Sequence, residues 1–175
     1  MKLAALLAAT AAIVAAPASA SDPWRALHRP LRIPQLAPGA ACPVAQAHSV
    51  SPRFGLALGD GPAYPAGLGT EATLKFTDPP ASAWAPSAWS GNKVLWIVAP
   101  SYRGPVLIRG RQVDGPNLVR FDGGYLPPLE LRIAASSGWR SHPSYTRVRA
   151  AGCYAYQVDG TSFSRVIVFS AALDG

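Results

Sequence analysis

The chain has 175 residues, 16 lysines and arginines, nine aspartates and glutamates, and a formal net charge of +7 at pH 7. This length fits one domain with a real hydrophobic core. The basic residues are scattered rather than gathered in a dense run, which argues against a nucleic-acid-binding patch. No CxxC pair occurs, so a thiol–disulfide redox motif is absent.

The first twenty residues are typical of a secretory signal peptide. Lys2 supplies the positive charge, residues 3–16 are apolar, and Ala18-Ser19-Ala20 matches the small-x-small cleavage pattern. The apolar run is too short to span a bilayer, and no second long run follows. We therefore expect cleavage after Ala20 and export to the periplasm, the cell surface or the medium, without an integral membrane segment. The alternative is an uncleaved anchor.

Residues 21–43 predict a proline-rich extended arm that either floats or lies along the domain. Proline at this density blocks helix interiors and central strands. The arm ends at Cys42, and the only other cysteine is Cys153. In an exported chain two cysteines favour one disulfide, the alternative being two free thiols. Such a bond would close a loop of about 110 residues and stabilise the fold by roughly 4–5 kcal/mol.

Residues 44–175 predict an all-β domain, because short β-type runs alternate with Gly- and Pro-containing turns. The expected strands cover residues 53–58, 71–77, 93–99, 105–112, 117–122, 129–134 and 146–150, followed by a final hairpin. The run 93–99 is continuously apolar, as in a central strand covered on both faces. The pattern favours an immunoglobulin-like antiparallel β-sandwich of about seven or eight strands.

The final hairpin, residues 152–169, contains an Asp159-Gly160 turn signal between two β-rich runs. Because side chains alternate along a strand, each run has two faces. The aromatic face carries Tyr154, Tyr156, Val158, Phe163, Arg165, Ile167 and Phe169. The small-residue face carries Cys153, Ala155, Gln157, Ser164, Val166 and Val168. Neither face is polar throughout, so we expect the small-residue face against the opposing sheet and the aromatic face under the arm or a loop.

Catalytic and metal-binding motifs are missing from the sequence. There is no GxSxG, no HExxH and no glycine-rich phosphate loop, and the three histidines are scattered. Most aspartates, including Asp159, lie in Gly- or Pro-containing turns that favour local hydrogen bonding. We therefore predict no catalytic residue, no metal site and no cofactor. The alternative is a hydrolase whose site converges from distant residues such as Asp60, His142 or Ser144.

Aromatic residues near predicted loops are the best candidates for binding. Tyr64, Trp84 and Trp89 could stack on sugar rings or anchor a protein partner if they are exposed. Arg109 and Arg111 alternate on a predicted strand and could add positive charge to such a surface. The competing interpretations are core packing for the aromatic residues and a solvated sheet face for the arginines.

Several segments resemble a group of uncharacterised exported bacterial proteins. They are Cys42-Pro43, residues 61–65 (GPAYP), 93–96 (KVLW), 104–110 (GPVLIRG), Pro143-Ser144 and above all 152–169 (GCYAYQVDGTSFSRVIVF). The resemblance implies an exported single domain and carries no established activity. The chain is also similar to immunoglobulin-like sandwiches, in which a late strand carries the second cysteine and a hairpin closes the domain.

These observations predict a non-enzymatic, exported binding domain of the cell envelope or secreted fraction. The expected partner is a glycan or an envelope protein rather than a nucleic acid. The alternative is a structural or accessory envelope domain without a ligand of its own. Fold similarity cannot decide between them, because one fold serves many functions.

Overall fold

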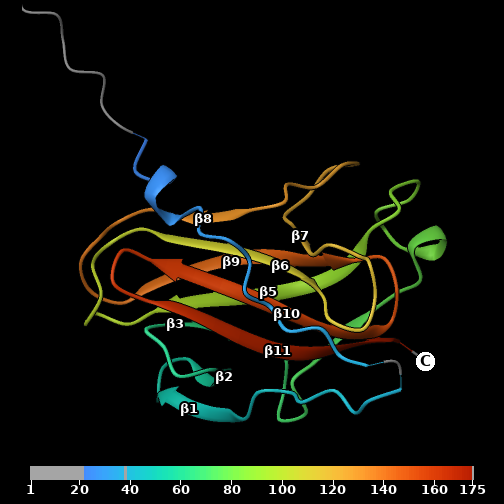
Figure 1. Cartoon of the computed structure of the whole chain (residues 1–175), viewed down its shortest axis with the longest axis horizontal. Coiled ribbons are helices and arrows are strands. Elements are labelled where there is room, and N and C mark those ends of the chain that lie inside the picture. Colours follow the sequence, from blue (N-terminus) through green and yellow to red (C-terminus); the bar gives the residue numbers. More distant parts are fainter. Residues whose placement is uncertain (1–21, 38, 175) are drawn as a thin grey trace, which may run out of the picture.

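A computed structural model describes residues 22–37 and 39–174, so the predicted signal peptide lies outside the described residues. The fold is an all-β sandwich, as predicted, built from two sheets (Figure 1). Sheet A has the strand order β1-β2-β3-β5-β9-β7, and sheet B has the order β4-β11-β10-β6-β8. No helix among the described residues is long and apolar enough to cross a membrane.

The strands differ in number and bounds from those expected. Sheet A contains β1 (Ala47–Ser51), β2 (Gly55–Leu58), β3 (Ala63–Ala66), β5 (Ser90–Val98), β7 (Arg120–Phe121) and β9 (Arg140–Val148). Sheet B contains β4 (Thr73–Phe76), β6 (Val106–Gln112), β8 (Leu131–Ile133), β10 (Gly152–Gly160) and β11 (Ser164–Leu173). The described residues form eleven strands, more than the seven or eight expected. The strands not expected, β1 and β3, gave weak signals because β1 is polar and β3 contains Pro65.

The main core lies between the two sheets and is dominated by aromatic rings. Trp96 of β5 meets Tyr156 of β10 edge to face, with ring centroids 5.1 Å apart. Tyr156 also stacks on Phe169 of β11 at 4.3 Å. The buried phenol hydroxyl of Tyr156 lies 2.8 Å from Thr146 Oγ1, so its polar end is satisfied. Aromatic packing therefore joins the final hairpin to sheet A.

Strand β5 is central and covered on both faces, as its apolar run predicts. It pairs with β3 on one side and with β9 on the other. Trp96 points into the main core, whereas Ile97 packs in a second cluster with Ala57 and Ala66. Both residues are fully buried.

The final hairpin turns two residues later than predicted. Val158 pairs with Arg165 and Asp159 with Ser164, and the Gly160 N–H donates to the Phe163 carbonyl oxygen at 3.0 Å. The turn therefore lies at residues 161–162, and the predicted turn at Asp159-Gly160 is wrong. The reason is that Asp159 bonds to neighbouring strands instead of its own turn. The two faces nevertheless contain the predicted residues, because the observed register preserves the alternation.

The two faces of the hairpin pack in the opposite sense to the prediction. The aromatic face, including Tyr154 and Phe169, fills the core between the sheets. The small-residue face, including Cys153 and Ala155, lies under the arm in a separate cluster. Alternation separates the faces but does not say which one enters the core. The apolar surface area of each face decides which one enters the core, because the larger aromatic side chains bury more of it between the two sheets.

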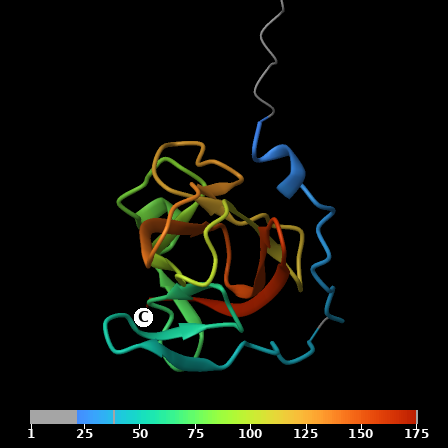
Figure 2. The same ribbon diagram turned by 90° about the vertical axis from the view of Figure 1, so that its left-hand side faces the viewer.

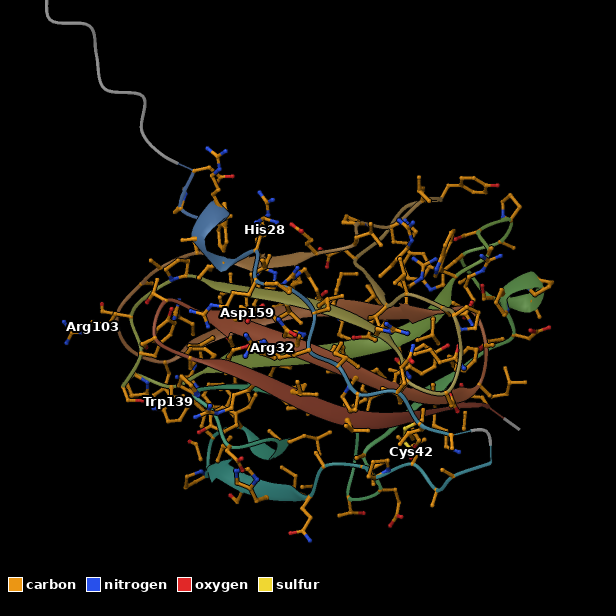
Figure 3. The ribbon with its side chains drawn as sticks, in the orientation of Figure 1. His28, Arg32, Cys42, Arg103, Trp139 and Asp159 are labelled. Atoms are coloured by element: carbon orange, nitrogen blue, oxygen red, sulfur yellow. A yellow bond between two sulfur atoms is a disulfide. The ribbon has the colours of Figure 1, made fainter. Side chains whose placement is uncertain are left out.

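The proline-rich arm lies along the outer face of sheet B (Figures 1 and 2). Its backbone is held by Gln157, whose Oε1 accepts from the Arg32 N–H at 2.6 Å and whose Nε2 donates to the Pro30 carbonyl oxygen at 3.1 Å. Ile33, a residue of the arm, is buried against Cys153 and Ala155 on this face. The arm therefore forms an additional layer over sheet B. Figure 3 labels Arg32 on the arm and Asp159 on β10, the strand that the arm covers.

The predicted Cys42–Cys153 disulfide is present, with the two Cα atoms 5.5 Å apart. It joins the end of the arm to the outer face of β10 rather than linking the two sheets through the core. An antibody-type domain places its disulfide between the sheets. The immunoglobulin-like comparison therefore stays a prediction, while the two-layer sandwich is confirmed.

One strand pair departs from the expected antiparallel arrangement. β4 runs parallel to β11, with Ser170 opposite Thr73 and Leu173 opposite Phe76. A parallel neighbour needs a long connection, and the whole domain between these strands provides it. β11 consequently lies between β4 and β10 instead of at the edge of sheet B.

Candidate functional site

Two loops project at one end of the sandwich (Figure 1, green and amber loops). They lie beside a group of aromatic and basic side chains. They span residues 77–89, between β4 and β5, and residues 122–130, between β7 and β8. The Ser87 hydroxyl joins them by donating to the Tyr125 carbonyl oxygen at 2.8 Å. We call the side chains gathered there the Trp–Arg cluster; its members are Trp84, Trp89, Arg120, Arg147 and Arg149.

Trp84 is half-buried against strand β9. The guanidinium of Arg147 lies 4.0 Å from the centre of the Trp84 ring, within the range of a cation–π interaction. The ring of Tyr145 meets Trp84 edge to face at 4.9 Å. Sequence alternation places Tyr145 and Arg147 on the outer face of β9, so the 77–89 loop folds over that face and covers it.

Arg147 is a fully buried cation that makes no ion pair with a described carboxylate. Its Nη1 donates to the Asp122 carbonyl oxygen at 3.1 Å, and its Nη2 donates to Ser87 Oγ at 3.2 Å. Its Nε and Nη2 also donate to the Trp89 carbonyl oxygen. Burial lowers the pKa of Arg147, but arginine starts so high that the group stays charged at neutral pH. The loops therefore enclose a permanent positive charge.

Trp89 lies beneath two further arginines. The guanidinium of Arg120 is 4.5 Å from the centre of the indole, and that of Arg149 is 5.0 Å from it. Arg120 Nη1 donates to the Pro127 carbonyl oxygen at 2.6 Å, which fixes its position. Arg149 is exposed and follows the end of β9. The indole thus holds two guanidinium groups at a defined place on the surface.

Two hollows open beside Arg149. One, of about 310 Å³, is lined by Trp89, Pro116, Asn117, Leu118, Arg120 and Arg149, and none of these described residues is acidic. The other, of about 530 Å³, is lined mainly by the 77–89 loop and includes Asp78 and Arg149. The first hollow combines an aromatic wall with two cations.

The positive charge of the cluster is not balanced by neighbouring ion pairs. Among the described residues, the ion pairs join Glu130 to His28 and to Arg132, and Asp159 to Arg109. None of them includes Arg120, Arg147 or Arg149. Asp122 is close by, but its Oδ1 accepts from Ser144 Oγ at 2.7 Å. An anion entering the hollow would therefore meet unpaired guanidinium groups.

The five predicted binding residues do not form one site. Trp84 and Trp89 lie together in the Trp–Arg cluster, both half-buried. Tyr64 lies on β3 and packs partly against the cluster around Ile97, with its ring 6.0 Å from that of His48. Arg109 and Arg111 belong to β6, in the other sheet.

Arg109 lies beneath the arm rather than on an open face. Its Nη2 donates to Asp159 Oδ2 at 2.9 Å and to the Arg29 carbonyl oxygen at 2.5 Å. Asp159 also accepts from Gln157 Nε2 at 2.9 Å and from Ser164 Oγ at 2.6 Å. The expectation that Asp159 serves a turn is wrong, since it is a fully buried carboxylate that ties β6, β10 and the arm together.

The residues proposed for a distant hydrolase site do not converge. Ser144 Oγ donates directly to Asp122, with no described histidine between them. His142 shares strand β9 with Ser144, whereas Asp60 lines a separate hollow with His48 and Arg165. No three His, Cys, Asp or Glu side chains gather as a metal site would require within residues 22–37 and 39–174.

Sequence reasoning missed Arg120, Arg147 and Arg149 as members of the candidate site. They come from β7, from β9 and from the turn after β9, and reach the tryptophans only through the fold. The one local signal was Arg147 and Arg149 alternating beside an apolar run. That signal indicates an exposed basic face and does not identify an aromatic partner.

Comparisons of the chain with protein-family models, with curated proteins and with solved structures find no match.

Proposed function

We propose that this protein is a non-enzymatic, exported binding domain of the cell envelope or secreted fraction, and that it binds an acidic glycan at the Trp–Arg cluster. The observation that carries the proposal is the hollow in which Trp89 lies beside Arg120 and Arg149 without a carboxylate among its lining residues.

The arrangement favours an anionic ligand over a neutral sugar. Both arginines lie over the indole of Trp89, so a ligand that reaches the ring also meets two guanidinium groups. Guanidinium groups bind carboxylate, sulfate and phosphate oxygens through paired, charge-assisted hydrogen bonds. The buried charge of Arg147 adds to the positive field, because its surroundings screen it less than water would.

Export is supported by the disulfide and by the amino-terminal sequence. Disulfides persist mainly in oxidising compartments, and both cysteines of this chain are used in one. Residues 1–20 have the charge, apolar run and cleavage pattern of a signal peptide. Acidic polysaccharides are abundant anions that an envelope or secreted protein could meet.

A binding titration of residues 21–175 tests the proposal. The probes are polygalacturonic acid, which carries a carboxylate on every sugar, and dextran, which is neutral. We expect binding to the first and not to the second. Arg149→Gln should weaken binding by about tenfold or more, since one charge-assisted hydrogen bond contributes roughly 1.5–3 kcal/mol.

Arg53→Gln is the matched control, because Arg53 is also exposed and also lies over an aromatic ring, that of Phe54, at 5.2 Å. Equal weakening by both variants would mean attraction by net charge alone and would contradict a defined site. Failure of polygalacturonic acid to bind would contradict the proposed ligand and favour a protein ligand or an accessory role without a ligand.

A further inference from the structure

A second surface lies beside the Trp–Arg cluster, at the tip of the 122–130 loop. Tyr125 and Leu126 are adjacent in sequence and are 69% and 63% exposed, more than any other large hydrophobic residue described. Leu129, in the same loop, is 45% exposed. Exposed apolar side chains that gather at one place mark an interaction site, unlike single ones scattered over a surface.

Hydrogen bonds fix the backbone at the base of this loop, so its exposed tip has a defined position. Pro127 is buried, and its carbonyl oxygen accepts from Arg120 Nη1 at 2.6 Å. The Phe121 N–H donates to the Pro128 carbonyl oxygen at 2.9 Å. Tyr125 is held through its own carbonyl oxygen by Ser87. Hydrogen bonds on both sides thus fix a tip whose side chains point away from the core.

Basic side chains surround the apolar tip. A hollow of about 590 Å³ beside the loop is lined by Leu126 and Leu129 together with Arg120 and Arg132. Glu130 also lines it, but this carboxylate is already paired with Arg132 at 3.0 Å and with His28 at 2.7 Å. Arg149, which lies over the Trp89 ring as Arg120 does, adds an exposed charge at the same end.

We infer that this end of the domain docks on an anionic lipid bilayer, with Tyr125 and Leu126 entering the interface and the arginines facing phosphate groups. Tyrosine is favoured at the boundary between headgroups and acyl chains. Weak apolar insertion and electrostatic attraction each give marginal binding, whereas the two together give stable attachment. The 122–130 loop supplies the apolar side chains, and the nearby Arg120 and Arg132 supply the positive charge.

Vesicle binding tests the inference with phosphatidylglycerol–phosphatidylcholine mixtures and with phosphatidylcholine alone. We expect residues 21–175 to sediment with the anionic vesicles, to bind neutral vesicles at least tenfold more weakly, and to be released by salt. Leu126→Ser should reduce binding by about tenfold. Leu56→Ser is the control, because Leu56 is 44% exposed on β2 and belongs to another surface.

A fluorescent probe separates insertion from mere attraction. Both native cysteines are bonded, so Leu126→Cys introduces a single free thiol for an environment-sensitive dye, and Leu56→Cys provides the control. A blue shift on anionic vesicles at position 126 only is expected. Binding without that shift, or equal loss in Leu126→Ser and Leu56→Ser, would overturn the inference. Polygalacturonic acid binding should be unchanged in Leu126→Ser, so this test and that of the proposed function can fail separately.

Discussion

Asp159 is a fully buried carboxylate whose two oxygens accept hydrogen bonds from Arg109, Gln157 and Ser164. Buried charges are tolerated when they are paired and hydrogen-bonded, and they are costly when one partner is removed. At this position the carboxylate joins two neighbouring strands and orients Gln157, which holds the arm.

Asp159→Ala should therefore lower the free energy of unfolding by about 3–5 kcal/mol, because it leaves the Arg109 guanidinium buried without its counter-charge. Denaturant unfolding of the oxidised domain measures this loss. Asp60→Ala, which removes an exposed carboxylate, should change stability by no more than about 0.5 kcal/mol. Comparable losses in the two variants would contradict a structural role specific to Asp159.

Two buried tyrosines make the fold sensitive to high pH. Burial raises the pKa of Tyr154 to about 12, and burial also raises the pKa of Tyr156. The fold thus favours the neutral phenols. The neutral phenols contribute fully to the free energy of unfolding below pH 10, the usual tyrosine pKa in the unfolded chain. This contribution is lost as the pH rises from about 10 through about 12.

Stability measured by denaturant unfolding should accordingly fall between pH 10 and about 12. Tyr154→Phe should make this decline shallower, since phenylalanine does not ionise. Spectroscopic titration of tyrosinate provides a second measurement, in which part of the tyrosine absorbance appears only with unfolding. Titration of all six tyrosines near pH 10 in the folded domain would refute the prediction.

Among the elements, the β5–β9 pair forms the floor of the candidate site, and it depends on Gly91. Gly91 lies opposite Arg147, and a Cβ atom there would overlap the carbonyl oxygen of Thr146. Strand backbone cannot move aside as a flexible side chain can. The absence of a side chain thus keeps β9 in register and Arg147 beneath the loop.

Gly91→Ala should destabilise the domain by about 1–3 kcal/mol or more, the usual effect of overpacking. It should also weaken binding of acidic probes, because Arg147 and the tryptophans would shift with β9. Gly123→Ala is the control, since its Cβ would meet Trp84 at an ordinary 3.7 Å. Wild-type stability in Gly91→Ala would show that β9 tolerates the displacement.

The elements also show how far the sequence allowed prediction. Fold class, the central strand β5 and the two faces of the final hairpin followed from local alternation and apolar runs. The sequence did not predict which face of the hairpin packs in the core and which lies under the arm. Gln157 and Asp159 have their partners in the arm and in β6, far away in the sequence. The candidate site was half predictable for the same reason: Trp84 and Trp89 were identified, whereas their arginine partners are distant in sequence.

At the scale of the whole molecule, the disulfide closes a loop between residues 111 positions apart. Replacing both cysteines, as Cys42→Ser with Cys153→Ser, should lower stability by about 4–5 kcal/mol, since a long loop regains much entropy when unfolded. The midpoint of guanidinium unfolding measures the effect. A reducing agent should shift the midpoint of the native domain and leave that of the double variant unchanged. An equal shift in both would contradict the prediction.

The position of β11 has a consequence for the order of folding. This strand of ten residues lies between β4 and β10 and supplies Ile167 and Phe169 to the core. Sheet B is therefore divided until β11 has been synthesised, and long-range pairing of this kind is slow. The core between the sheets therefore stays open at β4 and β10 until β11 has been synthesised and has paired with both.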